Sequence, residues 1–392
     1  MQTRVVFILC AMTLVTGIAS MVVYFGHGHT PLGGVHGKIG FVALALMILH
    51  LVKRFSRLQF VIMKFRIVVL FIIINILCSS CNKSVKPTEN EQALIESIQE
   101  ILSVKKQLAE TYWPEFDKEG LSAPIVFFED SVCYVVNPRE KFLKEINCVK
   151  IQTQGIDFYR TTRLDESSFR MDTHVDLYSD TTYTGRDPYV MCSTLNESKK
   201  MFDDIEDETQ WIPMVIHELV HGCQDSHPNH YTARKACDYP LFELDLAAYP
   251  SQNPWLSDML STENDCLLSA ISCKDADATE AFIKNFLECR QSRKEKMRNI
   301  FGESIVKEEE AFEMAESMAR FMEVKSALLL ECPEEKYDNE DNPFFSKNVQ
   351  QAYFFVTGYN LVRLFVKLGI DLDLPYQNKE HSALEDYLMA NS

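Results

Sequence analysis

The chain has 392 residues, 46% of them hydrophobic, and carries a formal net charge of −17 at pH 7. This length is enough for one large or two ordinary domains, and the composition is that of a globular protein. The first 80 residues contain basic but no acidic side chains, so the acidic excess belongs to the rest of the chain. We therefore expect no nucleic-acid partner.

Three apolar runs at the N-terminus predict membrane helices. They span residues 5–24, 39–52 and 67–77. Basic residues cluster between the second and third runs, which predicts a cytoplasmic loop there and an exit from the membrane after Leu77. The large C-terminal region is therefore expected in the cell envelope, facing the periplasm or the cell surface.

The third run also has the order of an export signal. Residues 63–81, MKFRIVVLFIIINILCSSC, place basic residues before a short apolar core, followed by small residues and Cys81. The segment resembles a bacterial lipoprotein signal with its lipobox, LCSSC. The resemblance implies cleavage before Cys81, lipidation of that cysteine and a translation start at Met63. The alternative is a third transmembrane helix, for which the run is short.

Residues 1–62 allow two interpretations. The stretch VHGKIGFVALALMILHLVKRF, residues 35–55, resembles the second half of small membrane helix pairs of the b-type cytochrome kind, which implies that His36 and His50 face a haem. The chain would then be a membrane redox protein. The alternative is a mis-annotated extension. We therefore divide the chain into residues 1–62, a signal peptide at 63–80, a tether at 81–91 and a main domain at 92–392.

The main domain is predicted to belong to the α+β class. A sheet-containing lobe, about 92–230, ends in a helix that carries a metal-binding motif, and a mainly α-helical lobe, about 231–392, follows. The expected cleft lies at their junction. The expected elements are a helix at 92–113, a hairpin at 123–137, strands at 156–164, 174–178 and 189–195, and helices at 242–249, 277–297, 304–330 and 348–368.

The spacing of the cysteines does not indicate a zinc ribbon or a thioredoxin motif. Nine of them follow Cys81, from Cys133 to Cys332, and none has the C-x-x-C spacing. Outside the cytoplasm some are expected to pair as disulfides, but the odd number leaves at least one free. The sequence alone does not indicate which cysteines pair.

The stretch WIPMVIHELVHGCQDSH, residues 211–227, contains the pattern H-E-x-x-H. On a helix, His217 and His221 project from one face and can share a metal ion, with Glu218 beside them. Neutral imidazoles suit Zn2+, and a carboxylate can take a proton from a zinc-polarised water. The alternative is an ordinary amphipathic helix with paired polar residues.

A third protein ligand is needed, and the sequence offers three candidates. The stretch EMAESMARFMEVKSA resembles the E-G-x-A-x-Y-x-E segment of gluzincin metallopeptidases, which implies that Glu316 binds zinc, although Ser317 and Phe321 depart from the pattern. Glu243, on an earlier helix, is the thermolysin-like alternative, as a ligand or as an outer carboxylate. His227 is the metzincin alternative, but Gln224 replaces the glycine of that motif.

The run of glutamates around Glu316 also allows a simpler interpretation, because charge runs usually mark a solvated helix face.

Taken together, the motifs predict a zinc-dependent peptide-bond hydrolase, a gluzincin-like metallopeptidase anchored as an exported lipoprotein, with Glu218 as the general base. Tyr353 and Tyr359 are candidate oxyanion donors. The alternatives are a metzincin-like peptidase and a non-catalytic surface-binding lipoprotein that would not hold metal.

Overall fold

A computed structural model of the chain describes residues 84–175, 188–203, 205–231, 243–332, 353–377 and 383–391. These residues belong to one unit of the chain, Ser84–Ser392. The predicted membrane runs, the cytochrome-like segment, the export signal and Cys81 all lie outside the described residues. Within the described ranges, no helix combines the length and apolar character that a membrane span requires.

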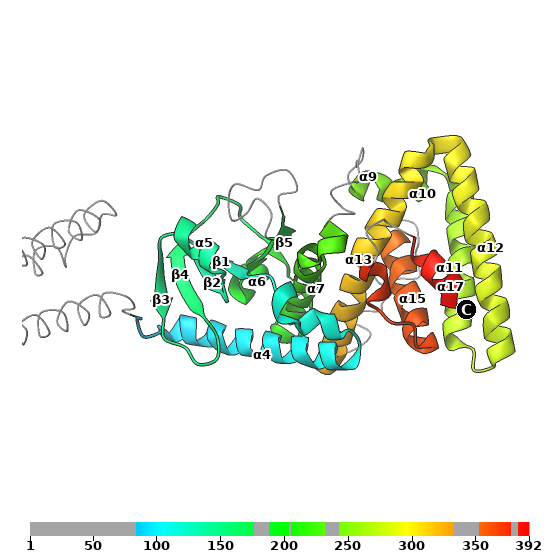
Figure 1. Ribbon diagram of the computed structural model, residues 1–392. Coiled ribbons are helices and arrows are strands. Elements are labelled where there is room, and N and C mark those ends of the chain that lie inside the picture. The colour runs from blue at the N-terminus through cyan, green and yellow to red at the C-terminus, as the bar shows by residue number, and fades with distance from the viewer. Residues whose placement is uncertain are drawn as a thin grey trace, which may run out of the picture. The chain divides into compact units, whose positions relative to one another are not determined.

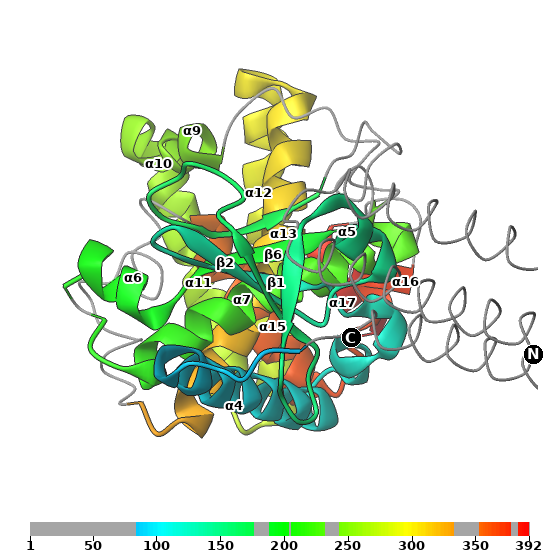
Figure 2. The same ribbon diagram turned by 90° about the vertical axis from the view of Figure 1, so that its left-hand side faces the viewer.

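The N-terminal part of the described unit contains a six-stranded sheet with the order β3-β4-β2-β1-β6-β5 (Figures 1 and 2). All neighbouring strands pair antiparallel except β1 and β6, which are parallel. The strands are β1 (Ile125–Glu129), β2 (Val132–Val136), β3 (Cys148–Ile151), β4 (Phe158–Thr162), β5 (Met171–His174) and β6 (Tyr189–Ser193). The predicted hairpin is confirmed by β1 and β2, whose turn places Asp130 at a φ of 39°, a conformation that aspartate tolerates.

The two faces of the sheet are covered differently because side chains alternate along each strand. Phe127, Val136 and Val190 join the main core with α4 (Glu89–Thr111) and α7 (Glu208–Ser226). The opposite face forms a smaller cluster in which Val126 and Phe128 pack with Phe142 of the short helix α5 (Glu140–Glu145). The face under α4 and α7 is therefore the one that positions the motif helix.

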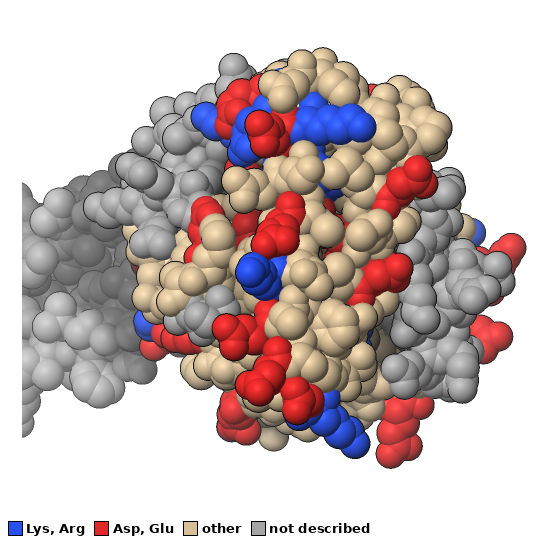
Figure 3. Space-filling view, turned by 90° about the vertical axis from the view of Figure 1, so that its right-hand side faces the viewer, with Lys and Arg blue, Asp and Glu red and all other residues tan. Residues whose placement is uncertain are grey.

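A series of helices continues from α7 away from the sheet (Figure 1). The long helix α13 packs on α7, α15 packs on α13, and the hairpin of α11 and α12 packs outside them. The further elements are η1 (Pro114–Asp117), η2 (Glu119–Leu121), α6 (Leu195–Met201), α9 (Glu243–Ala247), α10 (Tyr249–Gln252), α11 (Pro254–Ser272), α12 (Ala276–Phe301), α13 (Glu303–Leu329), α15 (Tyr353–Leu368), α16 (Leu374–Gln377) and α17 (Leu384–Asn391). Seen from the side of α12, acidic side chains are scattered over the surface among fewer basic ones (Figure 3).

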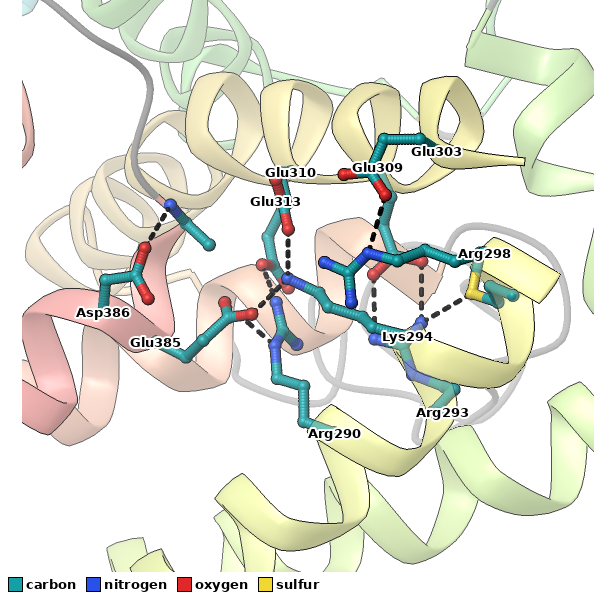
Figure 4. Close-up of polar contacts among 12 residues, drawn as sticks. Arg290, Arg293, Lys294, Arg298, Glu303, Glu309, Glu310, Glu313, Glu385 and Asp386 are labelled. Carbon is teal, nitrogen blue, oxygen red and sulfur yellow. Dashed lines mark hydrogen bonds and ion pairs between the residues drawn. The ribbon is translucent and has the colours of Figure 1, made fainter. Parts of the chain in front are cut away.

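Buried ion pairs join the outer helices to α13 (Figure 4). Arg293 of α12 binds Glu263 of α11 and Glu309 of α13, each with a shortest nitrogen-to-oxygen distance of 2.7 Å. Arg290 binds Glu263 at 2.7 Å and also pairs with Glu313 of α13. All five side chains are at most 1% exposed. The interpretation of this glutamate run as a solvated face is therefore wrong for Glu309 and Glu313.

The expected α+β class is contradicted, whereas the expected N-terminal membrane helices lie outside the described residues. The described fold is mixed α/β, with the six-stranded sheet in the middle of the chain and a mostly helical C-terminal part. In the helical part that follows, α13 packs directly on α7. β5, at Met171–His174, overlaps the strand expected at 174–178 at His174, and residues 176–178 of that expectation lie outside the described residues. The helix α11 was not among the expected helices, and it contains many Ser, Thr, Asn and Asp residues, which have low helix propensity.

Candidate metal centre

The motif residues lie on α7, and their placement follows from the way this helix forms. The Asp207 side chain caps the helix by accepting a hydrogen bond from the Thr209 N–H at 2.8 Å. One side of the helix is apolar and fills the core beneath the sheet, through Trp211, Ile212, Val215, Ile216, Leu219 and Val220. The polar motif is therefore turned towards the neighbouring helix α13.

His217, His221 and Glu316 lie together where α7 crosses α13. The two Nε2 atoms are 3.1 Å apart. The Glu316 carboxylate lies 3.3 Å from His217 Nε2 and 3.4 Å from His221 Nε2. Among the described residues, these three form the one group whose ligand atoms lie mutually close enough to hold a metal ion. The three side chains are 12–15% exposed, so the group is sheltered but reachable by solvent.

Both histidines are oriented by a partner on their other ring nitrogen. Glu323, two helical turns beyond Glu316 on α13, lies 2.7 Å from His217 Nδ1. Gln224, one turn beyond His221, contacts its Nδ1 through Oε1 at 2.9 Å. Because a carboxylate and an amide oxygen can only accept, each Nδ1 is the donor in a neutral ring, and each Nε2 then carries its lone pair. In this neutral form, which metal binding requires, both Nε2 lone pairs would point into the group.

Gln224 also explains why the metzincin arrangement does not form. Its Nε2 donates to the Ala315 carbonyl and to the Tyr376 hydroxyl, both at 2.9 Å, and the residue is buried within α7. The helix therefore continues to Ser226 instead of turning at Gln224. His227 becomes the residue that follows the helix and is not part of the three-residue group. Glu243 begins α9, and its side chain is outside what the structure describes.

The charges of the group favour a cation at its centre. Burial favours a higher pKa for Glu316, but the charge of His221 and the hydrogen bonds from both histidines outweigh it and hold the pKa below its usual range. Burial favours a lower pKa for His217, yet its contacts with Glu316 and Glu323 raise the pKa to about 10. The pKa of His221 is raised as well, by Glu316 against the effect of burial. Positive charge is thus stabilised here.

Glu218 is held beside the group by the edge strand of the sheet. The Thr173 hydroxyl of β5 lies 3.1 Å from Glu218 Oε2 and 2.9 Å from the Glu218 backbone oxygen. Glu218 is 8% exposed, and burial raises the pKa of its carboxyl. The general-base candidate is therefore fixed in place next to both histidines. Thr173 carried no signal in the sequence, because the strand was expected three residues later.

The candidate oxyanion donors are engaged elsewhere. The Tyr353 hydroxyl donates to Glu309 at 2.8 Å, and the residue is fully buried. Tyr359 packs its ring against Phe321 and beneath the Arg363 guanidinium. The expectation that Tyr353 faces the metal centre is therefore wrong.

No protein-family model, curated protein or solved structure matches this chain. A functional assignment therefore has to rest on the chemistry of the site.

Proposed function

We propose that this chain is a zinc-dependent peptide-bond hydrolase of the gluzincin-like kind. In this proposal His217, His221 and Glu316 hold the zinc ion and Glu218 is the general base. The observation that carries the proposal is the group of three side chains at the crossing of α7 and α13, with both imidazoles oriented through Nδ1. Two histidines and one glutamate are a ligand set known from zinc hydrolases, and such a set leaves a coordination position open.

The spacing of the donor atoms supports zinc. Atoms that each lie about 2.0–2.1 Å from one tetrahedral zinc ion are roughly 3.3 Å from one another. The two Nε2 atoms are 3.1 Å apart, Glu316 Oε2 lies 3.3 Å from His217 Nε2, and the other oxygen of the same carboxylate, Oε1, lies 3.4 Å from His221 Nε2. The three side chains would therefore need little movement to hold the ion.

A bound zinc would supply Lewis acidity, which lowers the pKa of a water towards neutrality and polarises a substrate carbonyl. Glu218 takes the proton of the attacking water and passes it to the leaving amine. Its buried position raises the pKa of the carboxyl, which makes it a better proton acceptor. The Thr173 hydroxyl restrains one Glu218 oxygen and so keeps the base oriented.

An extended peptide is the substrate that best suits the surroundings. β5 is the last strand in the described sheet order, and it carries Thr173 beside the general base. Its four residues are all partly exposed. Edge strands bind extended peptides by adding another strand through main-chain hydrogen bonds. A peptide bound in this way would pass Glu218 and the metal ligands.

We also propose that the enzyme works in the cell envelope, held to the membrane by a lipid on Cys81. This part rests on the sequence of residues 63–81, which lie outside the described residues. The N-terminal region is thus an anchor, and the unit that begins at Ser84 carries the chemistry.

The test combines metal analysis with an unbiased activity assay. The full-length chain should contain about one zinc per molecule and cleave members of a mixed peptide library, as read by mass spectrometry. Glu218→Gln should retain the zinc and lose activity by about 10²–10⁴-fold, the usual contribution of a general base. Glu100→Gln, an exposed glutamate on α4, is the matched control and should behave as wild type.

Three results would contradict the proposal. Undiminished cleavage by Glu218→Gln would remove the general base from the mechanism. Zinc bound at full occupancy without cleavage of any library peptide would favour the non-catalytic surface-binding protein. Cleavage that survives complete removal of metal would refute the role of zinc.

A further inference from the structure

The helices α11 and α12 form an antiparallel hairpin whose register is fixed by buried charge. α11 ends at Ser272 and α12 begins at Ala276. Glu263 of α11 lies 2.7 Å from Arg290 and 2.7 Å from Arg293 of α12. Since these three side chains are at most 1% exposed, the two helices cannot slide past each other without leaving a buried charge unpaired.

This register brings two cysteines face to face. Moving one turn forward from Glu263 on α11 leads to Cys266, and moving back from Arg293 by one turn on the antiparallel α12 leads to Cys289. The two thiols interact closely enough that, in addition to burial, Cys289 contributes to raising the pKa of Cys266. Both residues are half-buried, and the structure records both as free thiols.

The other described cysteines are in different surroundings. Cys133, Cys192, Cys223 and Cys332 are buried, and the half-buried Cys148 lies on β3, at one end of the described sheet order. Cys273 lies at the end of α11, where its thiol contacts the Asp275 carbonyl at 3.5 Å. Cys273 is therefore a natural control, because it shares the hairpin and the partial exposure of Cys266.

We propose that Cys266 and Cys289 are a redox pair that forms a disulfide across the α11–α12 hairpin. The oxidant is a small-molecule or protein disulfide, for example glutathione disulfide. A thiolate of the pair attacks the oxidant and forms a mixed disulfide, and the second thiolate displaces the leaving thiol. In total the two cysteines lose two protons and two electrons, and the oxidant is reduced to two thiols.

The position of the bridge gives it a structural effect beyond the hairpin. It would lie one helical turn from the Glu263 ion pairs, whose arginines also hold Glu309 and Glu313 of α13 (Figure 4). Glu316 follows Glu313 by one turn on the same helix. The disulfide would therefore stabilise the helices that support the candidate metal ligand. The proposal does not depend on metal binding or on peptidase activity.

The pair suits the expected location of the protein. Outside the cytoplasm, thiols encounter oxidising conditions in which disulfides persist, whereas cytoplasmic reductants keep thiols reduced. Burial raises the pKa of the Cys266 thiol, so unassisted oxidation by air should be slow and a disulfide oxidant should be needed. The bridge would close a loop of about 25 residues, which is long enough for a measurable gain in stability.

The test is a thiol map of the full-length protein after equilibration with glutathione disulfide or with dithiothreitol. Free thiols are alkylated, the protein is digested at basic and acidic residues, and cross-linked peptides are identified by mass spectrometry. No such residue separates Cys266 from Cys273. The map is therefore made in the Cys273→Ser variant, which keeps the proposed pair. The expected result is a Cys266–Cys289 cross-linked peptide in the oxidised sample alone.

Thermal unfolding provides a second measurement. Oxidised wild type should melt about 5 °C above the reduced protein, as a loop of this length predicts. Cys266→Ser and Cys289→Ser should each abolish the difference, and Cys273→Ser should keep it. The proposal is overturned if both thiols stay free after equilibration with glutathione disulfide and are then alkylated, or if either one cross-links mainly to another cysteine.

Discussion

Removing the carboxylate of Glu323 should weaken zinc binding although this residue does not touch the metal position. Glu323 accepts a hydrogen bond from His217 Nδ1 at 2.7 Å. It also pairs with Arg320 at 2.7 Å, and both side chains are only 8% exposed. Glu323→Gln keeps an oxygen acceptor but loses the charge. Glu323→Ala loses both and leaves the Arg320 cation near the site without its carboxylate.

The size of the effect follows from these contacts. Loss of an outer partner of a ligand histidine typically costs 10–100-fold in metal affinity, or about 1.4–2.7 kcal/mol. We expect Glu323→Gln near the lower value and Glu323→Ala at or beyond the upper one, since the Arg320 cation would then lie near the metal without the compensating charge of Glu323. Glu316→Ala should lose far more, because it removes a ligand. His227→Ala should bind zinc as wild type does.

The assay is competition of the full-length variants with a chromophoric zinc chelator at constant pH. The expected order of affinity is wild type and His227→Ala, then Glu323→Gln, then Glu323→Ala, with Glu316→Ala last. Retention of zinc by Glu316→Ala together with its loss from His227→Ala would refute the reasoning and would support the metzincin ligand set. Equal affinity of Glu323→Ala and wild type would show that the Nδ1 contact does not orient the ligand.

Three further predictions concern stability and anchoring. Gly222→Ala should lower the free energy of unfolding by about 1–3 kcal/mol, as measured by urea unfolding, because the new Cβ would lie 2.8 Å from Val190 Cγ2. Helix propensity alone predicts a gain of about 1 kcal/mol, and such a gain would contradict this packing. Arg293 holds the pKa of Glu309 below its usual value, against the effect of burial. The ionised Glu309 therefore stabilises the folded protein above the unfolded pKa of about 4, and this contribution is lost as the pH falls. The stability difference between wild type and Glu309→Gln should therefore shrink between pH 6 and pH 3, and a constant difference would exclude this pairing. Cys81→Ser should abolish fatty-acid labelling of the protein in cells, and labelling at the wild-type level would disprove lipidation at Cys81.

The local patterns of this sequence were sufficient for several elements. Alternating apolar residues on either side of Asp130 predicted the β1–β2 hairpin, and the structure has it. The periodic spacing of apolar residues predicted α4, α12 and α13 to within a few residues of most of their ends. The class of the fold was missed because the parallel pairing of β1 with β6 joins segments about 60 residues apart, and no local pattern encodes it.

The glutamates of α13 show a similar limit. Glu309, Glu313, Glu316 and Glu323 are equally acidic in the sequence, and a charge run ordinarily indicates a solvated face. The structure gives them different partners: arginines of α12 for Glu309 and Glu313, and the α7 histidines for Glu316 and Glu323. Which side chain faces which helix depends on the packing angles of α7, α12 and α13 together.

The sequence by itself determined that His217, Glu218 and His221 would be neighbours, because residues three or four apart on a helix share a face whatever the rest of the chain does. Only the tertiary structure decided that Glu316 meets them and that His227 does not. The distance along the chain from His221 to Glu316 exceeds 90 residues, so their contact depends on long-range helix packing. The exclusion of His227 depends on Gln224, whose hydrogen bonds to α13 and α16 keep α7 helical where the metzincin motif would turn.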